Sequence, residues 1–310
     1  MPYDNISIVY MGTPEFAVPP LQALANAGYD VKAVVTVADK PSGRGRKLQP
    51  SAVKKASLDL GIPVLQPSSL KDEGFLEELD ALQADLFVVV AFRMLPKEVW
   101  GKPRLGTFNL HGSLLPQLRG AAPIHWAVIN GLKETGLTTF LIDEQIDTGN
   151  ILLQEKLTIP PHWTTGTLHD ALLPVGAQLV VDTVNGLIEG SLSPQSQNDE
   201  DASHAPKLTK DNTRLDFMLT PASLVQLIKG LSPFPSAYYG EFKFLDAAMC
   251  EKQNSSVDPI LRVRNKQLYL DYMLGSIEIT QIKAAGKRAM SSSDYINGLN
   301  CAQIPLKKPV

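Results

Sequence analysis

The chain has few cysteines, and it lacks a segment of the kind that directs secretion. Cys250 and Cys301 are the 2 cysteines among its 310 residues. Two isolated cysteines are too few for a disulfide framework or a cysteine-based zinc site, which favours a reducing compartment. The first residues, MPYDNISIVYMG, carry no basic residue ahead of their apolar run, so a secretory signal is not predicted.

Long apolar runs and nucleotide-binding motifs are also scarce. No run approaches the roughly 18 consecutive apolar residues of a membrane span. The first strand-like run ends in a single glycine, Gly12, followed closely by Pro14, which is typical of a plain strand-to-helix turn rather than a dinucleotide fingerprint. We therefore expect a cytoplasmic monomer that has no membrane partner and requires neither a metal nor ATP.

The net charge of −3 gives no large excess of either sign, and by itself it argues against a nucleic-acid partner. The average hides an asymmetry, because residues 207–310 contain 14 Lys and Arg against 9 Asp and Glu, a net charge of +5. Residues 1–206 contain 15 against 23, a net charge of −8. This split indicates either ordinary scatter or an anionic partner for the C-terminal part.

What the sequence does contain is an alternation of buried strands and helices. Apolar runs without polar alternation are found at Ile6–Tyr10, Val31–Val37, Leu86–Ala91, Thr107–Leu110 and Thr138–Ile142. Helical spacing is found at residues 17–27, 54–60, 123–131 and 167–189. Such an alternation predicts an α/β fold, a Rossmann-type domain with a mostly parallel sheet that is covered on both faces.

The composition changes at Ser191–Pro206, which is polar, contains two prolines and shows no periodicity. It is predicted to be a linker. A short helical stretch at 221–230 and several short strand-like runs follow it, which predicts a smaller, C-terminal OB-like β-barrel domain. The predicted organisation is a catalytic domain at 1–190, a linker at 191–206 and a second domain at 207–310.

The stretch at 38–50, ADKPSGRGRKLQP, follows a strand and is predicted to be a long mobile loop. It carries Lys40, Arg44, Arg46 and Lys47 among two glycines. Loops of this length in compact domains are usually functional or disordered. Four cations on a flexible stem suit phosphate groups, whereas a solvated, solubilising loop is the alternative.

The stretch FNLHGSLLPQLRGAAP at 108–123 places an amide and an imidazole at the predicted end of a strand. Because side chains alternate along a strand, Asn109 and His111 point to the same face, at the edge where α/β proteins place their sites. An amide that donates to an oxygen, beside an imidazole, suits a tetrahedral intermediate. A carboxylate to orient the imidazole is offered by Asp143, Glu144 or Asp147.

These segments resemble the folate-dependent formyltransferases. The resemblance rests on N-L-H-G-S-L-L-P at 109–116, R-G-A-A-P-I at 119–124 and I-D-T-G at 146–149. Three further segments narrow the resemblance to the members of this family that formylate methionyl initiator tRNA. They are the M-G-T-P-E-F start, the G-R-G loop at 43–45 and G-K-R-A-M at 286–290. The similarity extends over nearly the whole chain. One departure is the segment after Ala91, which is one residue shorter than the family's.

The resemblance implies an N-terminal domain that binds 10-formyltetrahydrofolate as formyl donor and a C-terminal barrel that helps to hold tRNA. It implies catalytic roles for Asn109, His111 and Asp147. Contacts to the folate are expected from Phe92, Ser113, Leu114, Leu115, Pro116 and Asp143. Contacts to the tRNA are expected from Lys40, Arg44, Arg46, Lys47 and Arg119.

Three other functions stay open at this point. A formyltransferase that acts on an amino-sugar nucleotide would share the N-terminal motifs, but it would not need the basic loop. A formyltetrahydrofolate hydrolase would use the same three residues with water as nucleophile. A tRNA-binding module without catalytic activity would have no need of the three residues.

Overall fold

The chain forms two compact units in the computed structural model, which describes residues 6–42, 47–250, 255–299 and 301–307. The first unit comprises Met1–Gly120, Gly136–Leu157 and Asp170–His204, and the second comprises Ala121–Thr135, Thr158–His169 and Ala205–Val310. The sequence predicted single boundaries at 190 and 207, whereas two short segments from the middle of the chain belong to the second unit. Independent folding of 1–190 and 207–310 stays a prediction.

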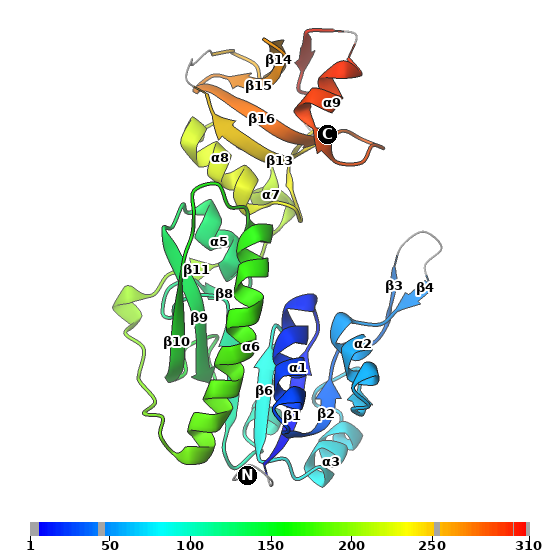
Figure 1. The fold of residues 1–310 in the computed structure, drawn as a ribbon, viewed down its shortest axis with the longest axis vertical. Helices are drawn as coiled ribbons and strands as arrows, with labels where there is room; N and C mark the ends of the chain where they lie inside the picture. The colour runs from blue at the N-terminus through cyan, green and yellow to red at the C-terminus, as the bar shows by residue number, and fades with distance from the viewer. Residues whose placement is uncertain (1–5, 43–46, 251–254, 300, 308–310) are drawn as a thin grey trace. The chain divides into compact units, whose positions relative to one another are not determined.

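A seven-stranded sheet lies at the centre of the first unit (Figure 1), in the order β10-β9-β7-β6-β1-β2-β5. Its strands are β1 (Ser7–Gly12), β2 (Asp30–Val35), β5 (Val64–Leu65), β6 (Leu86–Val90), β7 (Thr107–His111), β9 (Glu134–Leu141) and β10 (Ile151–Thr158). Five of them pair in parallel, and every residue of β1 and β6 is buried, as their apolar runs require. The predicted Rossmann-type fold is confirmed.

Strand β9 departs from the parallel pattern, since it pairs with β7 in the antiparallel direction. The end of β9 at Leu141 is therefore level with Phe108 near the start of β7, and His111 is level with Thr138. In the parallel arrangement predicted for most of the sheet, the ends of these two strands would lie at one edge, and the antiparallel pairing shows that they do not. The chain after Leu141 has to turn back before it can reach the end of β7.

Helices connect or follow the strands of the first unit, and the last of them begins in the second unit. They are α1 (Val18–Asn26), preceded by the 3-10 turn η1 (Glu15–Ala17), α2 (Ala52–Asp59), α3 (Glu73–Ala81), α4 (Lys97–Trp100) and α6 (Thr165–Glu189). The hydroxyl of Ser51 accepts the backbone N–H of Lys54, and the carboxylate of Asp72 accepts that of Phe75. These side-chain caps satisfy backbone donors that the first turn of a helix leaves free, and they fix where α2 and α3 begin.

Helix α6 has 25 residues, and by length and composition alone it is apolar enough to cross a membrane. This property was not predicted from the sequence, because polar residues interrupt the apolar run of the helix. The hydroxyl of Thr183 lies 2.8 Å from that of Thr139 on β9. A Cβ at Gly176 would lie 3.1 Å from Leu110 on β7. These contacts are those of a core helix packed on a sheet, a type that passes the same test, so α6 is weak evidence for a membrane span.

The basic loop predicted at 38–50 is in part a β-hairpin, which corrects the sequence interpretation. Strands β3 (Lys40–Ser42) and β4 (Lys47–Gln49) pair in the antiparallel direction and project from the first unit (Figure 1). At its base, the ammonium of Lys54 lies 2.8 Å from the carboxylate of Asp39 and 2.7 Å from the side-chain oxygen of Gln66. Arg44 and Arg46 lie outside the described residues.

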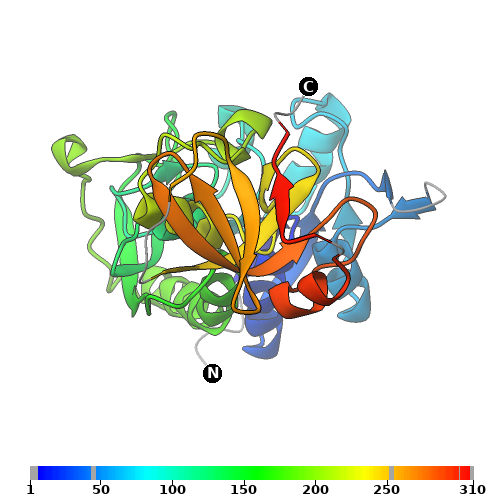
Figure 2. The same ribbon diagram turned by 90° about the horizontal axis from the view of Figure 1, so that it is seen from above.

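The second unit is built on an antiparallel sheet in the order β12-β13-β16-β15-β14-β18, with β17 paired to β16. Its elements are α5 (Pro123–Ile129), α7 (Lys210–Thr213), α8 (Pro221–Gly230), β12 (Ala237–Tyr239), β13 (Phe242–Met249), β14 (Ile260–Arg264), β15 (Gln267–Tyr272), β16 (Gly275–Lys283), β17 (Met290–Ser291), α9 (Ser292–Asn297) and β18 (Gln303–Pro305). Figure 2 shows the twist of these strands, in yellow to red. A Cβ at Gly240, beside β12, would lie 2.8 Å from the carbonyl of Lys307, beyond β18. The two edges of the sheet therefore approach each other, as in a barrel.

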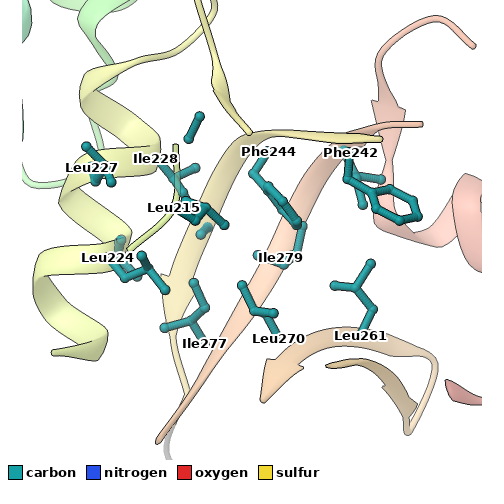
Figure 3. Close-up of a cluster of buried hydrophobic side chains, with 14 of the residues drawn as sticks. Leu215, Leu224, Leu227, Ile228, Phe242, Phe244, Leu261, Leu270, Ile277 and Ile279 are labelled. Carbon is teal, nitrogen blue, oxygen red and sulfur yellow. The ribbon is translucent and has the colours of Figure 1, made fainter. Parts of the chain in front are cut away.

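An apolar core fills the second unit (Figure 3). It is formed by residues of α8 and of the sheet, among them Leu224, Ile228, Phe244, Leu270 and Ile279. Ile129 of α5 packs against this core, and a Cβ at Gly230 of α8 would lie 2.3 Å from its Cγ1. A glycine at 230 lets α5 and α8 approach closely. The predicted smaller C-terminal β domain is confirmed.

Candidate active site

Asn109 and His111 lie two residues apart on β7, so they share one face of the strand. Asn109 is half-buried, and its side-chain amide makes no hydrogen bond to another described residue. The side chain of His111 is buried, with the residue 5% exposed. An amide that has no protein partner is free to donate to a bound substrate, whereas a buried imidazole needs partners of its own.

Both ring nitrogens of His111 face hydrogen-bond acceptors. Its Nδ1 lies 3.6 Å from Oδ2 of Asp147, and its Nε2 lies 2.9 Å from the carbonyl oxygen of Leu118. The ring of Phe140 packs edge-on against it, with the centroids 6.4 Å apart. The contact with Leu118 could not be predicted from the sequence, because that residue belongs to no motif.

Asp147 reaches the imidazole from the loop that follows β9. This loop turns back on itself, with the N–H of Leu141 donating to the carbonyl of Asn150 at 2.9 Å. Asp147 adopts a φ of 58°, in the left-handed region that residues other than glycine rarely occupy. Its carboxylate Oδ2 accepts the N–H of Gly120 at 2.8 Å. The structure thus selects Asp147 from the three acidic residues as the partner of His111.

The other two acidic residues have different partners. The carboxylate of Asp143 accepts the N–H of Gln145 at 3.0 Å and the hydroxyl of Thr148 at 2.8 Å, so it shapes the loop. Glu144 pairs with Lys97 at 2.8 Å on the surface. The hydrogen bond to Lys97 lowers the pKa of Glu144, and the same bond raises the pKa of Lys97.

The S-L-L-P segment is held against the neighbouring strands. The hydroxyl of Thr138 donates to the carbonyl of Ser113 at 2.7 Å, and the N–H of Leu115 donates to the hydroxyl of Thr138 at 3.0 Å. Ser113 and Leu115 are buried, whereas Leu114 and Pro116 are half-buried. The segment therefore forms a fixed wall beside β9, and its expected contacts to a folate stay a prediction.

Two exposed apolar side chains that received no role from the sequence follow β6 and β9. Met94 is 69% exposed and Ile146 is 57% exposed, whereas the predicted Phe92 is half-buried against the core. Exposing large apolar side chains is unfavourable, and a flat aromatic ligand is one group that would cover them. In the sequence, Met94 and Ile146 could have been noticed because each is an apolar residue beside a charged residue in a loop.

The residues predicted to contact tRNA fall into two groups. Lys40 is exposed on β3, and Lys47 begins β4. Arg119 on β8 (Arg119–Gly120) is buried instead, 8% exposed, and its guanidinium is bonded to Gln197 and Asp199. These partners lie in the segment predicted as a linker. Its 3-10 turn η2 (Asp199–Asp201) and strand β11 (His204–Ala205) are short, and much of the segment packs onto the first unit.

Comparisons with known proteins agree with these motifs. A family model described as formyl transferase matches residues 4–184, and one described as formyl transferase, C-terminal domain, matches residues 207–300. Two similar relatives, both named methionyl-tRNA formyltransferase, come from Parabacteroides distasonis and Bacteroides fragilis. The first is 46% identical, covering 96% of this chain and 97% of the relative, and the second is 48% identical, covering 98% of each.

A solved structure shares the fold at low identity. It is an N-formyltransferase from Helicobacter canadensis, described in complex with folinic acid and dTDP-3-aminofucose. Its TM-score is 0.67 and its identity 20%, and the match covers 89% of this chain and 99% of that one. At this identity the likeness supports the fold.

Proposed function

The chain belongs to the formyl transferase family, and we propose that it transfers the formyl group of 10-formyltetrahydrofolate to the α-amino group of methionyl initiator tRNA. The relatives that are 46% and 48% identical over nearly their full length carry the name of this activity. The observation that carries the chemistry is the approach of Asp147 to His111, two residues along β7 from Asn109, whose amide has no hydrogen-bond partner among the described residues.

Two features of the chain suit tRNA as the acceptor. Residues 207–310 carry a net charge of +5, while residues 1–206 carry −8. The β3–β4 hairpin presents Lys40 at its base, and Arg44, Arg46 and Lys47 follow in sequence. The cations at residues 40–47 and the net positive charge of residues 207–310 attract phosphates, whereas the net negative charge of residues 1–206 as a whole repels them. Because tRNA charging takes place in the cytoplasm, we expect the enzyme there, and the monomeric state stays a prediction.

The reaction exchanges one carbon–nitrogen bond for another. The α-amino nitrogen bonds to the formyl carbon, the bond between that carbon and N10 of the folate breaks, and the proton that the amine loses is balanced by the one that N10 gains. A free α-amino group has a pKa of about 7.7–8.0, so roughly a tenth to a sixth of it is neutral near pH 7, and esterification of the amino acid lowers this pKa and raises the neutral fraction. The greater need is to stabilise the formyl oxygen as it becomes negative and to remove the surplus proton.

We assign the first task to Asn109 and the second to His111 with Asp147. The amide of Asn109 has no described hydrogen-bond partner, so it can donate to the formyl oxygen without breaking a bond inside the protein. The Nε2 of His111 is bound to the carbonyl of Leu118 at 2.9 Å, and it has to exchange this carbonyl for a substrate or water before it handles a proton. Asp147 holds the opposite side of the ring during that exchange.

Arg119 takes a structural role in this proposal, because its guanidinium is already bonded to Gln197 and Asp199. We place the folate against the S-L-L-P wall and the apolar residues that follow β6 and β9. Phe92, Met94 and Ile146 are the apolar side chains there that a flat ring system would cover. Asp143 orders the loop that carries Asp147, so we expect it to shape the folate site from the loop side.

The test is a formyl-transfer assay with purified full-length protein and 10-formyltetrahydrofolate. Three acceptors are compared, namely methionyl initiator tRNA, an amino-sugar nucleotide and water. We expect transfer to the charged tRNA to exceed the other two reactions at least a hundredfold in kcat/KM. Preferred transfer to the nucleotide, or release of formate alone, would replace the proposal with one of the other two enzymes. Binding of tRNA without any transfer would identify a binding module.

A further inference from the structure

The side chain of Gln197 makes four hydrogen bonds beside the turn that carries Asp147. Its side-chain nitrogen donates to the carbonyl oxygens of Asp147 and Gly149, at 2.9 and 2.8 Å. Its side-chain oxygen accepts from Nε and Nη2 of Arg119, at 3.0 and 2.8 Å. A glutamine amide has two N–H donors and one oxygen with two lone pairs, so every polar position of this side chain is used.

The orientation of the Gln197 amide follows from its partners. A guanidinium has donors alone, and a backbone carbonyl only accepts. With the amide turned over, its NH₂ would face the guanidinium of Arg119 and its oxygen would face two carbonyls, so all four bonds would be lost. Arg119 is anchored in turn by Asp199 at 2.8 Å. In this network Arg119 donates to Gln197, and Gln197 donates to the backbone of the turn that carries Asp147.

The backbone at Asp147 needs such a support. A φ of 58° at a residue with a side chain is unfavourable, by about 1–2 kcal/mol. Two residues later, a Cβ at Gly149 would lie 1.7 Å from the carbonyl oxygen of Leu141, so the turn packs closely against the end of β9. The side chain of Gln197 donates to the carbonyls of Asp147 and Gly149, and these two hydrogen bonds hold the turn in place.

The position of this turn sets the distance between Asp147 and His111. The 3.6 Å between Oδ2 and Nδ1 exceeds an ordinary hydrogen bond, so displacements of a few tenths of an ångström decide whether the two groups interact strongly. We infer that Gln197 is a positioning residue for formyl transfer, which acts through the backbone of Asp147. This inference rests on the proposed role of Asp147 in catalysis.

The first experiment compares two substitutions of equal size in the same segment. Gln197→Met keeps the shape of the side chain and removes its hydrogen bonds. Gln195→Met is the matched control, because Gln195 is exposed and its described contacts are backbone bonds to Ile151. We expect Gln197→Met to lower kcat by roughly 10- to 100-fold with both KM values within about threefold, the pattern of a loss confined to the transition state. Gln195→Met should stay within twofold of the wild type.

A second variant separates anchoring of Arg119 from positioning of Asp147. Gln197→Glu keeps acceptors for Arg119, and its negative charge strengthens that contact. It loses both donors and sets an oxygen against the carbonyls of Asp147 and Gly149. We expect this variant to stay folded, with an unchanged far-ultraviolet spectrum, and to lose at least as much kcat as Gln197→Met. Wild-type turnover in Gln197→Glu would overturn the inference.

The third measurement repeats Gln197→Met in an Asp147→Ala background. A residue that acts through Asp147 has nothing left to position there, so the second substitution should change kcat less than threefold. A further tenfold loss would assign Gln197 a general structural role and overturn the inference. If Asp147→Ala itself keeps near-full turnover, the proposed catalytic role of Asp147 fails, and that result is distinct from a failure of Gln197 alone.

Discussion

The carboxylate oxygen of Asp147 that faces His111 is also the oxygen that accepts the backbone N–H of Gly120, at 2.8 Å. Strand β8 at 119–120, which precedes α5, therefore donates to the same carboxylate oxygen that faces the imidazole of the candidate catalytic pair. A carboxylate that already accepts one N–H has less freedom to rotate away from the imidazole. Asp147 is thus fixed at its carboxylate by Gly120 and at its carbonyl by Gln197.

Asn109→Ala should lower kcat by roughly a hundredfold or more, the usual size of a lost oxyanion donor. The KM for the folate should change little, because the amide acts on an oxygen whose charge develops in the transition state. Asn130→Ala, at the end of α5, is the control, since its side chain makes no hydrogen bond to a described residue. Near-full turnover in Asn109→Ala, measured with saturating substrates, would remove Asn109 from the mechanism.

Lys54→Met should weaken the use of tRNA and spare the use of folate. Lys54 joins Asp39 to Gln66 at the base of the hairpin, and its hydrogen bond is the main cause that lowers the pKa of Asp39. Without this contact the β3–β4 hairpin is held less firmly at its base. We expect kcat/KM for tRNA to fall roughly five- to tenfold, which corresponds to the loss of one hydrogen bond of about 1–1.4 kcal/mol. The control is Lys55→Met, because Lys55 is exposed and its side chain makes no hydrogen bond or ion pair to a described residue. Equal defects for both substrates would point to misfolding instead.

Gly149→Ala should destabilise the first unit and abolish turnover, since the new Cβ would lie 1.7 Å from the carbonyl oxygen of Leu141. The backbone of β9 has to shift to admit it, which moves the turn of Asp147 as well. Gly74→Ala in α3 is the opposite case, with its nearest atom 3.4 Å away, and it should raise the melting temperature slightly. Differential scanning fluorimetry on both variants tests this, and a wild-type melting temperature in Gly149→Ala would contradict the packing described for that turn.

His125 should make the stability of the second unit depend on pH. Burial lowers the pKa of His125, and the positive charge of His169 lowers it further, against the opposing effect of the Phe234 carbonyl. The unfolded chain therefore binds the proton more tightly, and stability is lost as the pH falls below about 6.5, the ordinary value for histidine. His125→Gln retains an N–H for that carbonyl and cannot titrate. Its urea midpoint should fall less than that of the wild type between pH 7.5 and 5.5, and parallel curves would contradict the prediction.

Much of the fold was predictable because short continuous apolar runs that alternate with helical segments are typical of a parallel sheet covered on both faces. β1, β6 and β7 begin and end within a residue or two of their predicted positions. The direction of β9 was not predictable, since an apolar run is the same in both directions. β13 was missed because its sequence, FKFLDAAM, contains two charged residues and two alanines, although it pairs with both β12 and β16.

The candidate site was predictable as far as motifs extend. Asn109, His111 and Asp147 stand out because their chemistry is specific, and whether they catalyse stays a prediction. Gln197 did not stand out, because a glutamine in a polar stretch with two prolines has the composition of a linker. What gives it a role is the fold of the turn at 147–149, and that depends on contacts some 50 residues apart in sequence.

The interleaving of the two units affects how the chain can fold as it leaves the ribosome. Helix α5 belongs to the second unit, but its partner α8 begins about 90 residues later. At a synthesis rate of about 5–20 residues per second, α5 waits roughly 5–18 s before α8 emerges. During that interval the face of Ile129 that packs on the second core has no partner from α8 to cover it. Nascent chains halted between residues 130 and 220 should therefore be the forms that bind chaperones most strongly.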